Sequence, residues 1–135
     1  MDYGITVRTS APFSEVVARV REALKAQGFG VLTEIDVQAT FRDKLGQEME
    51  DYLILGACNP PLAHRALTAD RTIGLLLPCN VVVRTADSQT IVEALDPQVM
   101  VEVTGESSLE PIAAEAASRI RAALDWLADI AAPSE

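Results

Sequence analysis

Apolar and polar positions along the chain follow two periods, one typical of strands and the other of helices. Tyr3, Ile5 and Val7 alternate with polar or small residues, which predicts a half-buried strand. β-branched, aromatic and apolar residues predict further strands at 29–35, 52–57, 78–85 and 89–95. The segment 52–57 is continuously apolar, as in a strand buried on both faces. A short turn at 86–88 predicts a hairpin between the last two strands.

Helices are predicted by apolar residues at spacings of three and four, with start and stop signals around them. The stripe within 13–24 is followed by Gly28, a common helix stop. Asp36 and Gly46 bracket 37–45 as a capping residue and a stop, which predicts a second, shorter helix.

Three more helices are predicted in the second half of the chain. Asn59 and Asp96 each precede a proline, the usual order of an N-cap and a first helical residue. We therefore expect a helix over 60–69 and a short one after Pro97, although the Val-rich segment behind Pro97 also resembles a strand. A long apolar face predicts a final helix, whose start near Ser107 and Glu110 resembles a capping box.

Together these elements predict an α/β (α+β) fold. We expect a two-layer domain with a mixed, mostly antiparallel sheet of about five strands and helices packed on it. The chain of 135 residues has the length of a single domain, 1–135, with a core of about 3–130. No linker or low-complexity segment divides it.

Composition excludes several classes of protein and partner. An apolar share of 49% is too high for a disordered chain. The net charge of −9 argues against nucleic acid and against an anionic membrane surface as partners. The longest nearly uncharged run, 73–83, is about half of the ~20 residues that a membrane span needs. With no visible targeting segment and two cysteines, we expect a cytoplasmic protein with reduced thiols.

Three stretches of the chain carry a family resemblance. GFGVLTEIDVQATFRDKLG at 28–46, YLILGACNPPLAHRAL at 52–67 and IGLLLPCNVVV at 73–83 resemble the bacterial and archaeal family catalogued as domain of unknown function 302. The resemblance extends over roughly 7–127. It implies a small stand-alone α/β domain that pairs as a homodimer, and it assigns no catalytic residue. The matching segments do draw attention to Cys58 and Cys79.

The candidate chemistry is concentrated between these two cysteines. Cys58 lies between a predicted strand and a helix start, a position that can lower the pKa of a thiol. His64, the only histidine, falls in the second turn of the same helix and is a candidate base or co-ligand. In the simpler interpretation Cys58 is a small buried residue at the end of a strand and His64 faces solvent.

Cys79 opens a later strand and repeats the pairing of a cysteine with an asparagine, so Asn59 and Asn80 join the candidate site. If the two strands are antiparallel neighbours, the thiols come close; if they are parallel neighbours, they lie ~15–20 Å apart. Cys58, His64 and Cys79 are candidate ligands for zinc, copper or haem iron, but a physiological metal is the less favoured interpretation because no metal-binding spacing is present.

The sequence therefore supports three hypotheses. The leading one is a homodimer that binds a small molecule or supports thiol redox chemistry near Cys58 and Cys79. The second is a non-catalytic dimeric assembly module, which predicts a large apolar interface and no pocket near the cysteines. The third is a metal or haem carrier. No particular cofactor, reaction or ligand is implied.

Overall fold

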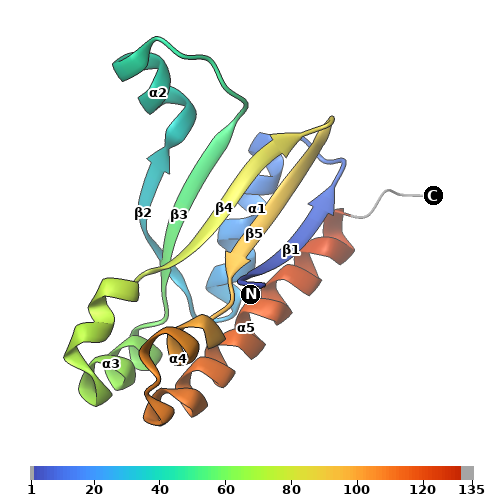
Figure 1. Cartoon of the computed structure of the whole chain (residues 1–135). Helices are drawn as coiled ribbons and strands as arrows, with labels where there is room; N and C mark the ends of the chain where they lie inside the picture. Colours follow the sequence, from blue (N-terminus) through green and yellow to red (C-terminus); the bar gives the residue numbers. More distant parts are fainter. Residues whose placement is uncertain (1, 132–135) are drawn as a thin grey trace.

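The computed structural model describes residues 2–131 and, over this range, shows a five-stranded sheet with helices on one face and at both ends (Figure 1). The strands are β1 (Gly4–Thr9), β2 (Gly30–Asp36), β3 (Tyr52–Cys58), β4 (Cys79–Ala86) and β5 (Gln89–Leu95). The helices are α1 (Phe13–Ala26), α2 (Val37–Leu45), α3 (Pro60–Ala69), α4 (Gln98–Thr104) and α5 (Glu110–Ala131). Two short 3₁₀ helices, η1 (Arg71–Leu76) and η2 (Ser107–Leu109), precede β4 and α5.

The sheet has the order β1-β5-β4-β3-β2, and within residues 2–131 every neighbouring pair is antiparallel. The predicted two-layer fold with five strands is confirmed, whereas the expected admixture of parallel pairing is not found. The reason is the position of α2 and α3, which lie beyond opposite ends of the strands (Figure 1). Because neither helix crosses a face of the sheet, the chain turns back beside the strand it has just left.

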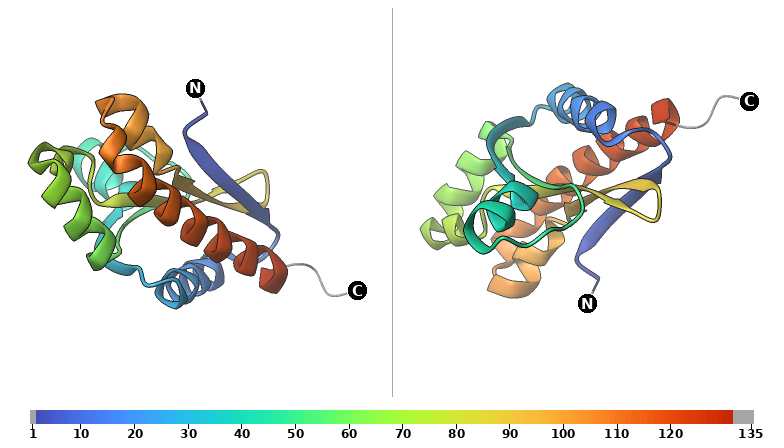
Figure 2. Two further views of the ribbon diagram at one scale, coloured as in Figure 1. Left: turned by 90° about the horizontal axis from the view of Figure 1, so that it is seen from below. Right: turned by 90° about the horizontal axis from the view of Figure 1, so that it is seen from above.

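The main core lies between the sheet and the pair of helices α1 and α5, which lie side by side against one face (Figure 2). Its fully buried side chains include Val16, Val20, Leu24, Leu55, Val81, Val83, Val92, Ile120 and Leu127. In β3, the side chains of Leu53, Leu55 and Ala57 are buried, whereas Tyr52 and Ile54 are only half-buried. The prediction that β3 is buried on both faces therefore holds for one face, because the described helices pack on that face.

A second, smaller core forms beyond the lower end of the sheet in Figure 1, where α3, η1, α4 and the first turns of α5 meet. Its buried side chains are Leu62, Ala66, Ile73, Met100, Leu109, Ile112 and Ala116. α5 belongs to both cores, since its later residues pack in the main core. Among residues 2–131, no helix combines the length and the apolar character needed to cross a membrane.

Candidate functional site

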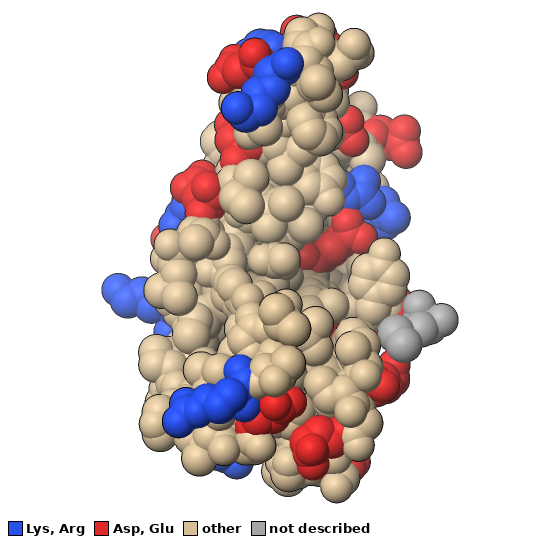
Figure 3. Space-filling view, turned by 60° about the vertical axis from the view of Figure 1, so that its left-hand side comes forward, with Lys and Arg blue, Asp and Glu red and all other residues tan. Residues whose placement is uncertain are grey.

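A cavity of about 300 Å³ lies where the two cores meet, at the end of β3 and the start of β4. Its walls come from the β2 region, β3, β4, α3, α4 and α5, and they include Phe29, Leu32, Ala63, Leu77, Met100 and Ala116. Nearly all of these side chains are apolar. From the side that carries β2 and α3, uncharged residues form a broad area in the middle of the surface (Figure 3).

Cys58 and Asn59 reach the cavity because they join the last position of β3 to the first turn of α3. Cys58 ends the strand and is half-buried in the cavity wall. Asn59 is the N-cap, and its Oδ1 accepts a hydrogen bond from the backbone N–H of Leu62 at 3.3 Å. Only 7% of Asn59 is exposed. The predicted cap is thus confirmed, and its carbonyl oxygen is already engaged within the protein.

Cys79 reaches the same cavity from the first position of β4. β3 and β4 are antiparallel neighbours, and Ala57 is the register partner of Cys79. Of the two geometries that the sequence left open, the structure has the one that brings the cysteines near each other. Cys58 is displaced by one position from that pair, and successive side chains of a strand point to opposite faces. Both cysteines are free.

The environment of Cys79 keeps its thiol protonated at neutral pH. Burial raises the pKa of Cys79 from 9.0 to about 11, and negative charge at Cys58 adds a smaller increase in the same direction. Only 7% of the residue is exposed, so its thiolate would lose nearly all of its hydration. At neutral pH, Cys79 is therefore a neutral part of the cavity wall and not an activated nucleophile.

His64 and Asn80 lie outside the cavity. The side of α3 that borders the cavity carries Leu62, Ala63, Ala66 and Leu67, whereas His64 is exposed. Asn80 follows Cys79 in β4, so its side chain points to the opposite face of the sheet, where it is exposed. Of the five candidate residues, the structure brings together Cys58, Asn59 and Cys79.

The candidate metal ligands are not assembled into one site. Over the described range 2–131, the structure contains no group of three or more His, Cys, Asp or Glu side chains able to hold a metal ion. Cys58, His64 and Cys79 do not form a ligand set, because the exposed side chain of His64 lies outside the cavity wall that the two cysteines share.

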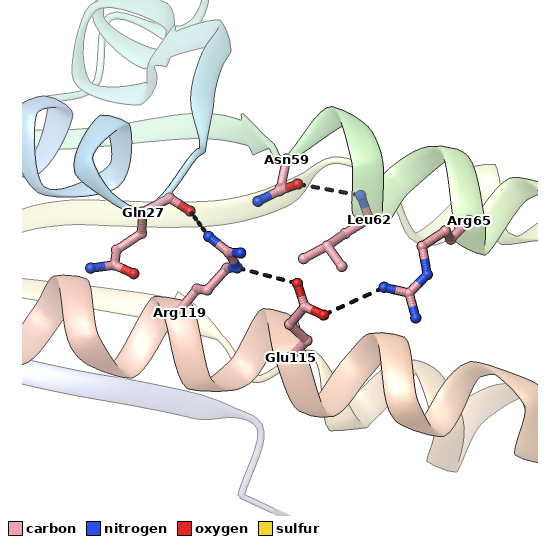
Figure 4. Close-up of polar contacts among 6 residues, drawn as sticks. All are labelled: Gln27, Asn59, Leu62, Arg65, Glu115 and Arg119. Atoms are coloured by element: carbon pink, nitrogen blue, oxygen red, sulfur yellow. Dashed lines mark hydrogen bonds and ion pairs between the residues drawn. The ribbon is translucent and has the colours of Figure 1, made fainter.

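A polar network ties α5 to α3 and to the turn after α1, close to Asn59 (Figure 4). Arg119 Nη1 donates to the carbonyl oxygen of Gln27 at 3.2 Å, and Arg119 Nε donates to Glu115 Oε2 at 3.3 Å. Arg65 Nη1 of α3 lies 3.4 Å from Glu115 Oε1. Two guanidinium cations thus share the single carboxylate of Glu115, so the three side chains carry a net charge of +1 beside a cavity whose own walls are uncharged.

Sequence reasoning missed most of the cavity wall. Phe29, Met100, Ile112 and Ala116 come from three separate segments, and each fits its own local pattern as an ordinary core residue. No local signal distinguishes them, because the cavity exists only where the two cores meet. The strand-to-helix junction at Cys58 was the part that a local signal revealed.

These features define a class of small α+β domains with an open antiparallel sheet, helices on one face and an apolar cavity at one end. The chain belongs to the family described as domain of unknown function DUF302, whose model matches residues 5–127. The resemblance inferred from the three sequence stretches is thereby confirmed.

A solved structure shares the fold. The crystal structure of an uncharacterized conserved DUF302 protein from Bacillus stearothermophilus is similar, with 32% sequence identity and a TM-score of 0.87. The similarity covers 93% of this chain and 98% of that one. A comparison with curated proteins finds no match.

Proposed function

We propose that this domain binds a small apolar molecule in the cavity between its two cores. The cavity carries the proposal: its volume of about 300 Å³ lies at the lower end of the range of small-molecule sites, ~300–1,000 Å³, and its walls are mostly hydrophobic. The cavity is open to solvent on one side, and a hollow of this size with such apolar walls is a common form of small-molecule site.

Thiol redox chemistry, the other branch of the leading hypothesis, has weaker support. A disulfide needs Cβ atoms that point toward each other, whereas Cys58 and Cys79 are offset by one position on adjacent strands. The raised pKa of Cys79 also lowers its thiolate population at neutral pH. We therefore assign the cysteines to the wall of a binding site. Free thiols of this kind suit the reducing cytoplasm, where we place the protein.

The cavity beside Cys58 and Cys79 counts against a module that serves assembly alone, but α2 favours dimerisation as a second property of the domain. No residue of α2 is buried, and Phe41 and Leu45 are 41% and 65% exposed. Leu32 and Ile35 of the preceding strand are also largely exposed. Apolar side chains on an edge strand and on the helix behind it are typical of an interaction surface. We propose a homodimer formed through this surface, which borders the cavity at Leu32.

Filling the cavity tests the binding proposal. Ala63→Phe places a large side chain on the cavity side of α3, and Ala69→Phe places the same side chain on an exposed position of the same helix. With the neutral fluorescent probe N-phenyl-1-naphthylamine, we expect one site per chain, an affinity reduced at least about tenfold in Ala63→Phe, and wild-type binding in Ala69→Phe. Equal binding by all three proteins, or no saturable binding by the wild type, would refute the proposal.

A further inference from the structure

The cavity wall is unusually rich in sulfur. The chain has two cysteines and three methionines, and three of these five residues, Cys58, Cys79 and Met100, line the cavity. They approach it from three elements, since Cys58 ends β3, Cys79 begins β4 and Met100 lies in α4. Sulfur is polarizable, and its contacts with the edges of aromatic rings are favourable. A ring placed in this cavity would have sulfur on several sides.

The cavity offers no partner for a charged ligand. None of the described residues that line it is an Asp, Glu, Lys, Arg or His. The pKa of Cys79, raised to about 11, leaves its thiol neutral at physiological pH. The nearby Arg65 and Arg119 both contact the carboxylate of Glu115 and not the cavity wall, and Asn59 uses its side-chain oxygen in the cap of α3. A buried ion without a partner is strongly disfavoured.

Size limits the ligand further. An apolar cavity of about 150 Å³ holds one benzene molecule. The cavity here has about 300 Å³, which is the space for two fused rings. Ala63 and Ala116 provide much of that space, because a larger side chain at either position would enter it.

We propose that the ligand of this site is an uncharged aromatic molecule of about two rings, recognised by the sulfur atoms of Cys58, Cys79 and Met100. This inference rests on the proposed binding function. A single soft metal ion such as Cu(I) would use the same atoms. The geometry favours the aromatic ligand, because the cavity is much larger than an ion and the two thiols are offset across the β3–β4 ladder.

Three probes separate the contributions of shape, aromaticity and charge. Naphthalene and decalin share a two-ring carbon skeleton, but only naphthalene is aromatic, and naphthalene-1-sulfonate adds a negative charge. N-phenyl-1-naphthylamine would place its naphthyl group in the cavity and its phenyl ring at the open side. We expect naphthalene to displace it at lower concentration than decalin does. We expect the sulfonate to bind at least about 100-fold more weakly than naphthalene, because the apolar walls offer its charge no partner.

Matched variants then test the role of sulfur. Met100→Leu keeps the side-chain volume and removes the sulfur, and Met49→Leu makes the same change at a residue outside the cavity wall. We expect Met100→Leu to lower the preference for naphthalene over decalin by about two- to tenfold, the range of a sulfur–aromatic contact. Met49→Leu should leave that preference unchanged, and an unchanged circular dichroism spectrum of Met100→Leu controls for its folding.

The outcomes distinguish the inference from the proposed function. If decalin equals naphthalene, if the sulfonate binds as tightly as naphthalene, or if Met100→Leu leaves the preference intact, the aromatic assignment is overturned while probe binding still supports a binding site. If Cu(I) alone binds at one equivalent and excludes naphthalene, a metal replaces the aromatic ligand. If no probe binds in a way that Ala63→Phe blocks, the proposed function itself fails.

Discussion

Ala57 of β3 lies directly opposite Cys79 of β4, so both side chains belong to the face of the sheet that the helices cover. Cys58 follows at the end of β3, where the strand passes into α3. The two thiols consequently meet the same cavity from adjacent but non-facing positions. The first prediction follows from the burial that this register imposes on Cys79.

We expect the Cys79 thiol to make the free energy of unfolding decrease as the pH rises into the alkaline range. Its folded-state pKa, about 11, lies above its ordinary value of 9.0, so its full contribution is present below about pH 9 and is lost as the pH rises through 11. Two pKa units correspond to about 2–3 kcal/mol in total. Urea unfolding between pH 8 and 11 should show this loss in the wild type beyond that in Cys79→Ala. Parallel pH profiles in the two proteins would contradict the prediction.

Gly56 is the position at which we expect the smallest substitution to be costly. A Cβ on Gly56 would collide with Oγ1 of Thr33 and lie 2.9 Å from Cγ of Pro78. Gly56→Ala should therefore lower the free energy of unfolding by about 1–3 kcal/mol, measured by urea denaturation. Gly30→Ala is the matched control, because a Cβ there meets nothing within 4 Å. Equal losses in the two variants would show that the crowding at Gly56 is relieved without cost.

The two helix caps Asn59 and Asp36 should differ in their effect on the cavity. Asn59 caps α3, which forms one wall of the cavity. Asp36 caps α2, which does not border the cavity, and its Oδ1 accepts a hydrogen bond from the Ala39 N–H at 2.9 Å. Either alanine variant should cost about 0.5–2 kcal/mol of stability. We expect only Asn59→Ala to weaken probe binding as well, in a fluorescence titration. Weakened binding in both variants would indicate a general loss of structure.

The exposed apolar side of α2 predicts a dimer that a single charge disrupts. Leu45→Glu should convert the protein to a monomer in light scattering coupled to gel filtration, with an unchanged circular dichroism spectrum. Leu75→Glu is the control, because Leu75 is an exposed leucine, 83% exposed, in η1. If the wild type is monomeric, or if both variants remain dimeric, the interface assigned to α2 is wrong.

Local signals predicted most of the elements. Asp36 and Gly46 bracket α2 as expected, and Asn59 and Pro60 begin α3 where the sequence placed it. These signals work because a cap or a stop satisfies backbone groups within a few residues of itself. The segment of η1 was not predicted as a helix, since its apolar residues resemble the strand that follows.

The candidate site was only partly predictable for a related reason. The end of a strand and the start of a helix place Cys58 and Asn59 together, and both are sequence neighbours. Successive side chains of a strand point to opposite faces, so the sequence alone implies that Cys79 and Asn80 lie on different faces of β4. The partners Met100 and Ala116 reach the cavity through the meeting of two cores, and that meeting depends on the arrangement of the whole chain.

The position of β1 beside β5 has a consequence for how the chain folds. Gly4 pairs with Leu95, so the first strand finds its partner only after most of the chain has been made. α5, the last helix of the described residues, contributes side chains to both cores. Contacts between segments so distant in sequence slow folding, because the entropy of closing the long intervening loop is lost before the contacts stabilise the fold. We therefore expect both cores to form only after α5 has been made, and a chain that ends before α5 to expose apolar surface of the kind that chaperones bind.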